Sequence, residues 1–292
     1  GLPKGVMLTH DNVVANIAQT TFPGASVITA DDRALGVLPF FHIYGLVPIL
    51  NAALRLGATL VTMPRFVLEA FLRVLSERRV TVAHVVPPIV LALAKHPLVA
   101  RYDLSHLRML FSGAAPLDAA LAEAAAARLG CVVRQGYGMT ESSPVTHFAA
   151  PEDEGAAGTV GPLVPNTEMR IVDLETGAEA PAGARGELQI RGPQVMKGYL
   201  GRPQATAETI DADGWLHTGD VACVDAQGRL VIVDRVKEQI KYKGLQVAPA
   251  ELEGLLLAHP SIADAAVVPF PDEEAGEVPV AYVVPHPAVV AD

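Results

Sequence analysis

The stretch LRMLFSGAAPLDAALAEAAAARLGCVVRQGYGMTESS, residues 107–143, decides the fold class of this chain. Residues 107–111 and 131–134 are short, mainly apolar runs, which predict two buried strands. Between them lie a loop of small residues, 112–115, and an alanine-rich helix, 116–130, that begins with a proline and is closed by a glycine. This order of strand, tight loop, helix and strand predicts a parallel β-sheet covered by helices, hence an α/β fold.

The same stretch predicts where a ligand binds. In sheets of this kind, ligands bind beyond the carboxyl ends of the strands. The segments 112–114 and 135–138 each follow a predicted strand, and another buried strand is predicted at 80–86. We therefore expect both segments at the edge of the sheet where ligands bind.

Shifts in composition divide the chain into three parts. Residues 1–155 alternate helix and strand and form the predicted α/β part. Residues 156–233 hold short strands separated by Gly, Pro and Asp turns, which predict a small antiparallel β subdomain. Residues 234–292 predict an α+β C-terminal domain with a helix at 249–259.

The composition excludes several classes of protein. With 22 Lys+Arg against 32 Asp+Glu the net charge is −10, so binding to nucleic acid or to an anionic membrane is disfavoured. An apolar share of 50% excludes a disordered chain. No apolar run reaches the ~18 residues of a membrane span. Two cysteines cannot form a disulfide framework and predict a reducing, cytoplasmic location.

The segment 135–141, Gln-Gly-Tyr-Gly-Met-Thr-Glu, carries the most chemistry. Its glycines permit close approach of a flat ring, and Tyr137 can stack on that ring. Thr140 can donate to a phosphate, and Glu141 can hold Mg²⁺, which uses few carboxylates and keeps waters. The alternative is a structural loop with a solvent-facing glutamate.

Other candidates are weaker when taken alone. Lys4 lies in a glycine-flanked turn that could approach phosphates or could be an ordinary surface turn. Asp220 could accept both hydroxyls of a ribose or form an ion pair with Arg235. His42 lies among large apolar residues, which suits either the core or a site that handles a carboxylate. Three of the six lysines lie within 237–243, where they could reach phosphates or simply be solvated.

Taken together, seven segments resemble the adenylate-forming acyl-CoA synthetase superfamily, and within it they are most similar to the 4-coumarate/cinnamate–CoA ligases. Their order and spacing carry the resemblance along essentially the whole chain. The segments are 1–10 (Gly-Leu-Pro-Lys-Gly-Val-Met-Leu-Thr-His), 38–44 (Leu-Pro-Phe-Phe-His-Ile-Tyr), 112–116 (Ser-Gly-Ala-Ala-Pro), 135–141, 186–192 (Gly-Glu-Leu-Gln-Ile-Arg-Gly), 214–220 (Gly-Trp-Leu-His-Thr-Gly-Asp) and 233–251.

The resemblance implies an enzyme that works in two steps, an acid–thiol ligase. A carboxylic acid and ATP would give an acyl-adenylate and diphosphate, and CoA would then displace AMP to give the thioester. ATP, Mg²⁺ and CoA are thus the expected cofactor and co-substrates, and small molecules the expected partners. The C-terminal domain would rotate about Asp234 between the two half-reactions.

Site residues follow from the resemblance, residue by residue. Thr140 would contact phosphate, Glu141 would hold Mg²⁺, and His42 would orient the carboxylate and gate the CoA tunnel. Lys4 would belong to the phosphate loop. The residues implied to line the adenine are Gly113, Ala114, Gln135, Gly136 and Tyr137. Those implied to bind ribose are Asp220 and Arg235; those implied to approach the adenylate are Lys237, Lys241 and Gln246; those implied near CoA are Lys243, Gly244 and Arg65.

An acyl pocket is also implied. Its members would be Ile43, Tyr44, Val47, His84, Phe111, Gly113, Gly136, Gly138, Pro144 and Val145. The glycines are expected to leave a flat slot for a cinnamoyl ring. Val47, His84 and Phe111 depart from the plant coumarate pattern, which often has Asn, Met and Lys there. Cinnamate or another aryl or medium-chain acid is therefore as plausible as coumarate.

Two further departures concern the ends of the chain. The Ser/Thr-rich start of the family's phosphate loop, with a preceding N-terminal subdomain, would lie before residue 1. The Ser-Gly-Lys segment with the adenylation lysine would lie beyond Asp292, and no lysine follows Lys243. We therefore expect a fragment that is inactive alone. The alternatives are a truncated, non-catalytic nucleotide-binding remnant, an adenylation domain that loads a carrier protein, a medium-chain ligase and, more distantly, a luciferase-type oxygenase.

Overall fold

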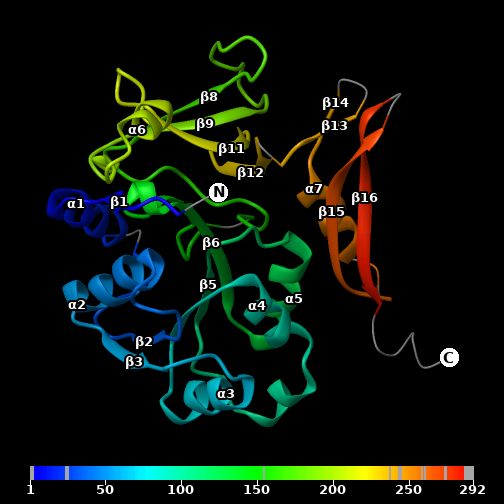
Figure 1. The fold of residues 1–292 in the computed structure, drawn as a ribbon. Coiled ribbons are helices and arrows are strands. Elements are labelled where there is room, and N and C mark those ends of the chain that lie inside the picture. Colours follow the sequence, from blue (N-terminus) through cyan, green and yellow to red (C-terminus); the bar gives the residue numbers. More distant parts are fainter. Residues whose placement is uncertain are drawn as a thin grey trace. The chain divides into compact units, whose positions relative to one another are not determined.

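The computed structural model describes most of the chain, in two compact units (Figure 1). The described residues are 3–23, 26–153, 155–236, 238–242, 245–257, 259, 261–272 and 275–285. The first unit comprises residues 1–169, 190–217 and 225–231, and the second comprises 170–189, 218–224 and 232–292. The predicted boundaries after residues 155 and 233 stay predictions.

A six-stranded sheet forms the centre of the first unit. Its strand order is β3-β2-β4-β5-β6-β7, and the first five of these strands are parallel while β7 is antiparallel to β6. The strands are β2 (Arg33–Gly36), β3 (Thr59–Thr62), β4 (Val82–Val85), β5 (Met109–Ser112), β6 (Val132–Gly138) and β7 (Val145–Phe148). The parallel sheet predicted from the sequence is confirmed.

Helices cover this sheet on both faces. One core cluster joins the strands to α3 (Leu68–Glu77), α4 (Pro87–Lys95) and α5 (Ala119–Leu129), and its centre includes the fully buried Phe71 and Leu110. The other cluster joins the opposite face of the strands to η1 (Gly45–Asn51) and α2 (Ala52–Leu56). The helix α1 (His10–Thr20) lies on the same side of the sheet as α2 (Figure 1). No helix in the described part of the chain is long and apolar enough to span a membrane.

Caps explain where α5 begins and ends and where α1 begins. The prediction that proline opens the helix after β5 is wrong, because α5 begins only at Ala119, where the Asp118 carboxylate accepts from Leu121 N at 3.0 Å. Gly130 closes this helix as predicted. In α1, Thr9 is the N-cap and forms a reciprocal capping box with Asn12, which fixes the start of the helix at His10.

One ion pair with a buried carboxylate ties the starts of three strands together. The Asp32 carboxylate, just before β2, accepts from the Arg108 Nε before β5 at 2.8 Å and from the Thr81 hydroxyl before β4 at 2.7 Å. Thr29 adds a backbone and a hydroxyl donor. Burial alone raises the pKa of Asp32, but the bonds from Arg108, Thr81 and Thr29 outweigh burial and lower it to about 2.

We expect Asp32→Asn to lower the free energy of unfolding by about 2 kcal/mol at pH 7, because it removes a bonded charge and leaves Arg108 without its carboxylate. The folded pKa lies below the unfolded one, so the stabilisation is present above about pH 4 and is lost as the pH falls toward 2. Urea unfolding at pH 7 and pH 3 measures both effects. Asp103→Asn, at an exposed loop, is the matched control. A loss equal to that of Asp103→Asn would contradict the argument.

The remaining sheets are smaller. The strands β8 (Glu168–Val172), β9 (Gly186–Arg191), β11 (Leu216–Val224) and β12 (Leu230–Arg235) form a sheet in the order β12-β11-β9-β8, and the division between the units runs through these strands. In the first unit, β1 (Val6–Met7) pairs antiparallel with β10 (Gly198–Tyr199), which precedes α6 (Pro203–Thr209).

The C-terminal part of the second unit is the predicted α+β arrangement. Its strands are β13 (Ile240–Tyr242), β14 (Leu245–Val247), β15 (Ile262–Asp272) and β16 (Gly276–Pro285), in the order β14-β13-β16-β15 with antiparallel pairing. The helix α7 (Pro249–Leu257) ends two residues before its predicted end. Val221, Val233 and Ala248 form the buried apolar centre of this unit.

Candidate functional site

The segment 135–141 lies at the carboxyl end of β6, as predicted. The strand is longer than expected, because it continues to Gly138 where the sequence predicts a loop from residue 135. The cause is pairing with β7, where Gly136 faces Phe148 and Tyr137 faces His147. The Gln135 side chain is buried and exchanges hydrogen bonds with the backbone of Leu117, at 3.1 and 3.3 Å. Gln135 therefore fixes the loop before α5 with its amide group.

Thr140 and Glu141 lie on the 3₁₀ turn η3 (Thr140–Ser142), directly after the end of β6. Thr140 is exposed and Glu141 is half-buried. The Tyr199 hydroxyl donates to Glu141 Oε1 at 2.6 Å, and the Met196 backbone N–H donates to the Glu141 carbonyl at 2.8 Å. The solvent-facing alternative for Glu141 is therefore wrong, because β10 and the residues before it hold this glutamate.

Lys4 lies beside the same tyrosine, Tyr199. Its Nζ lies 3.9 Å from the centroid of the Tyr199 ring, within the range of a cation–π interaction. Thus Tyr199 contacts two predicted site residues, Lys4 and Glu141, from one position. Sequence reasoning missed Tyr199, since the pairing of β1 with β10 that places it spans about 190 residues of chain.

The donor set suits a magnesium ion that is shared with a phosphate ligand. Within the described residues, no group of three or more His, Cys, Asp or Glu side chains could hold a metal. Glu141 offers a single carboxylate, and in that same part of the chain only Tyr199 bonds to its side-chain oxygens. Mg²⁺ in nucleotide sites uses one or two carboxylates and takes its other ligands from phosphates and water. The residues present therefore fit this ion.

In the second unit, Asp220 and Arg235 come together from β11 and β12. The Arg235 Nε lies 3.5 Å from Asp220 Oδ1; the arginine side chain is 69% exposed and the aspartate 14%. An ion pair of this exposure contributes little to the stability of the fold. Both interpretations of Asp220, a ribose ligand and a structural ion pair with Arg235, therefore stay open. Asp234, the predicted hinge residue, is buried on β12, and burial raises its pKa.

The lysine-rich segment is described only in part. In β13 and β14, the backbone of Lys241 faces that of Gln246. The predicted site residues Lys237, Lys243 and Gly244 lie outside the described residues, as do the side chains of Lys241 and Gln246. In the first unit, Arg65 and Ala114 are exposed.

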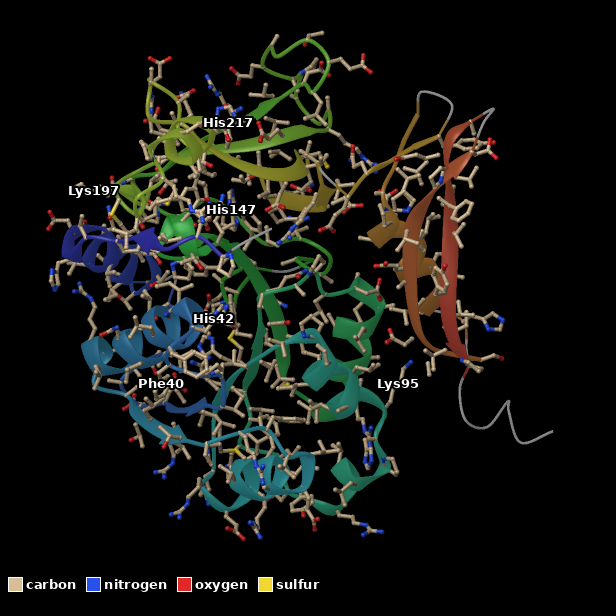
Figure 2. The ribbon with its side chains drawn as sticks, in the orientation of Figure 1. Phe40, His42, Lys95, His147, Lys197 and His217 are labelled. Carbon is tan, nitrogen blue, oxygen red and sulfur yellow. The ribbon has the colours of Figure 1, made fainter. Side chains whose placement is uncertain are left out.

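His42 is exposed, at the start of the turn that leads into η1 (Figure 2). The His42 Nδ1 accepts from the Tyr44 backbone N–H at 3.1 Å, and the backbone N–H of His42 donates to the Pro39 carbonyl at 3.0 Å. The core alternative for His42 is therefore wrong. The backbone contact fixes the ring and places the hydrogen of a neutral imidazole on Nε2.

Two glycines of the predicted acyl pocket lie against aromatic rings of the same unit. A Cβ on Gly113 would lie 2.9 Å from the Tyr44 ring, and one on Gly136 would lie 2.9 Å from the Phe111 ring. The rings occupy the Cβ side of both glycines, and the slot for a cinnamoyl ring stays a prediction. Each glycine permits the close approach of an aromatic side chain from the same unit.

Tyr44, His84 and Phe111 form a buried cluster on the face of the sheet toward η1. The His84 ring lies 5.7 Å from that of Tyr44 and 5.5 Å from that of Phe111. The Tyr44 hydroxyl lies 3.3 Å from His84 Nδ1 and donates to the Phe111 carbonyl at 3.1 Å. A hydroxyl has one hydrogen, so Nδ1 is the donor toward Tyr44. Burial lowers the pKa of His84 to about 4, which keeps the ring neutral at pH 7.

A small pocket of about 30 Å³ adjoins this cluster. It is mainly apolar and includes three of the predicted acyl-pocket residues, His84, Phe111 and Val145. Its complete lining is Thr20, Ser26, Val27, Ile28, Pro48, Ala52, His84, Phe111, Val145 and Phe148. Val47 is fully buried and is not part of this lining, and its neighbour Pro48 takes that place.

Comparison with known proteins decides the family. The model of the AMP-binding enzymes matches residues 1–200, and that of their C-terminal domain matches residues 251–292. The chain belongs to the AMP-binding enzyme family. It is 54% identical to 4-coumarate–CoA ligase 2 of Oryza sativa subsp. japonica over 97% of this chain and 51% of that protein. It thus spans about half the length of the curated relatives it matches.

Solved structures of similar proteins share the fold of the AMP-binding family. ATP-bound MatB from Rhodopseudomonas palustris matches with a TM-score of 0.91 and 32% identity, covering 100% of this chain and 57% of that one. The o-succinylbenzoate CoA synthetase MenE from Bacillus subtilis, in complex with its acyl-adenylate intermediate, matches with a TM-score of 0.85 and 31% identity, covering 98% and 57%. The α/β architecture predicted from the sequence is confirmed.

Proposed function

We propose that the protein to which this chain belongs is an AMP-forming acid–thiol ligase that converts a carboxylic acid, ATP and CoA into acyl-CoA, AMP and diphosphate. The observation that carries the proposal is the 54% identity to a 4-coumarate–CoA ligase across 97% of this chain. The proposed acid is an aryl acid of the cinnamate or 4-coumarate type. The apolar lining beside His84 and Phe111 supports an apolar acyl group, aryl or aliphatic.

In the first half-reaction, a carboxylate oxygen of the acid attacks the α-phosphate of ATP and diphosphate leaves. Negative charge grows on the phosphate oxygens, so the required help is positive charge and hydrogen-bond donors placed in advance. We assign this role to Lys4 and Thr140, and to Glu141 the holding of Mg²⁺. The ion, when bound, supplies charge neutralisation at the phosphates. Asp220 is assigned to the ribose and His42 to the carboxylate of the acid.

In the second half-reaction, the CoA thiolate attacks the acyl carbon and AMP leaves. We assign the approach to the adenylate to Lys237, Lys241 and Gln246, and the CoA side to Arg65, Lys243 and Gly244. A rotation of the C-terminal domain about Asp234 between the two steps belongs to the same proposal. So does a cytoplasmic location, which the free thiols support; burial raises the pKa of Cys131 to about 11 and keeps it unreactive.

The test uses the full-length protein with ATP, Mg²⁺, CoA and one acid at a time: cinnamate, 4-coumarate or octanoate. We expect AMP and CoA thioester in equal amounts with at least one aryl acid, and little with octanoate. Acyl-adenylate without thioester would favour a carrier-protein adenylation domain. Nucleotide binding without turnover would favour a non-catalytic remnant. Residues 1–292 alone are expected to form no thioester.

A further inference from the structure

Tyr199 lies between two residues of opposite charge. Its hydroxyl bonds to Glu141 Oε1 at 2.6 Å, and its ring lies under the Lys4 ammonium at 3.9 Å from the centroid. No ion pair joins Lys4 to Glu141 among the residues that the structure describes. The two charges are therefore close together in the fold, but each is held by a different part of one neutral side chain.

The position of Tyr199 is firmly fixed. The residue is 4% exposed, and its backbone N–H donates to the Thr206 hydroxyl at 2.9 Å. Its strand neighbours anchor β10 to the segment that carries Lys4, since Lys197 N donates to the Met7 carbonyl at 2.9 Å and Leu200 N to the Gly5 carbonyl at 2.8 Å. A side chain held in this way can set the geometry of the groups it contacts.

The chemistry of the phenol links its two contacts. The Glu141 carboxylate can only accept, so the Tyr199 hydroxyl is the donor in the bond to Glu141 Oε1 at 2.6 Å. A phenol that donates to a carboxylate carries more negative charge on its ring. This strengthens the attraction of the ring face for the Lys4 ammonium. The two contacts thus support each other.

We propose that Tyr199 is a positioning residue that keeps Lys4 and Glu141 adjacent but unpaired, ready for the phosphates and the Mg²⁺ of the nucleotide. The inference rests on the proposed function, which assigns phosphate to Lys4 and metal to Glu141. Without Tyr199 between them, an ammonium and a carboxylate that contact the same side chain would pair directly and neutralise each other. The nucleotide would then have to break that ion pair before it could bind.

The test is Tyr199→Phe in the full-length protein. The phenylalanine keeps the ring and the packing but cannot bond to Glu141. We expect the Kd for Mg·ATP, measured by calorimetry without an acid, to rise about 10-fold, and the Kd of Mn²⁺ in the presence of ATP, followed by electron paramagnetic resonance, to rise by a similar factor. The KM for Mg·ATP should rise with it, while kcat at saturation changes less than threefold.

Controls separate positioning from structure. Tyr102→Phe removes a hydroxyl elsewhere in the first unit and should change neither Kd. Tyr199→Leu removes the ring as well and should weaken Mg·ATP binding further than Tyr199→Phe does. If Tyr199→Phe, folded by circular dichroism, binds Mn²⁺ and Mg·ATP as tightly as wild type, the inference fails while the proposed function stands. If the wild-type protein binds no Mg·ATP at all, the proposed function itself fails.

Discussion

Glu141→Gln is expected to lower the rate of acyl-adenylate formation about 10³-fold, or about 4 kcal/mol in transition-state free energy. Glutamine keeps a carbonyl oxygen that can accept from the Tyr199 hydroxyl, so the local packing is retained. It loses the negative charge, which is the property that a hard divalent cation requires of its protein ligand. The substitution therefore separates the proposed metal-holding role from the structural role of the same side chain.

Single-turnover formation of adenylate from cinnamate, with Mg²⁺ varied, measures this effect. We expect the Mg²⁺ dependence of Glu141→Gln to move to higher concentration, with partial recovery of the rate at high Mg²⁺. Glu123→Gln, on the exposed face of α5, is the matched control and should retain the wild-type rate and Mg²⁺ dependence. A Glu141→Gln rate within threefold of wild type would remove Glu141 from the proposed metal site.

The core of the fold was predictable because its signals are local. The strands β4 and β5 are short, mainly apolar runs between turn residues. The end of α5 is marked in the sequence by Gly130. The errors lie where distant partners decide. The strand β6 reaches Gly138 only because β7 pairs with its last residues, and Asp118, not the proline two positions earlier, caps α5.

The same distinction applies to the candidate site. Thr140, Glu141, Asp220 and Arg235 could be selected from motifs, and the structure places each of these two pairs within one unit. Tyr199 could not, since its role arises from the pairing of β1 with β10. The glycines of the predicted slot were interpreted as space for a ligand. That Tyr44 and Phe111 lie against Gly113 and Gly136 could not be predicted, because these contacts join residues far apart in the sequence.

Gly161→Ala is expected to cost more than about 4 kcal/mol of folding free energy, the other large effect that the structure predicts. Gly161 has φ +83°, where an alanine costs about 1–2 kcal/mol in backbone strain. In addition, its Cβ would overlap the backbone of Phe148 and Ala149 at the end of β7. A side chain could relieve such an overlap by changing its rotamer, but backbone atoms cannot. The loop around residue 161 must therefore move away from β7.

Gly57→Ala is the matched control, because Gly57 has φ +75° in the same unit but nothing lies within 4 Å of its Cβ position. It should cost only the backbone strain, about 1–2 kcal/mol, in urea unfolding. The difference between the two variants measures the overlap alone. A Gly161→Ala protein within about 1 kcal/mol of Gly57→Ala would show that the loop relaxes and would contradict this argument.

The loss of stability in Gly161→Ala should extend to the candidate site. Gly161 accepts from Leu230 N at 3.0 Å, and the Phe148 N–H donates to the Pro162 carbonyl at 3.3 Å, so this loop holds the outer edge of β7. The strand β7 in turn pairs with Gly136 and Tyr137, in the segment that leads to Glu141. Amide hydrogen exchange should therefore accelerate at residues 136–138 in Gly161→Ala and not in Gly57→Ala. Equal exchange there in both variants would mean that β6 keeps its end without the support of β7.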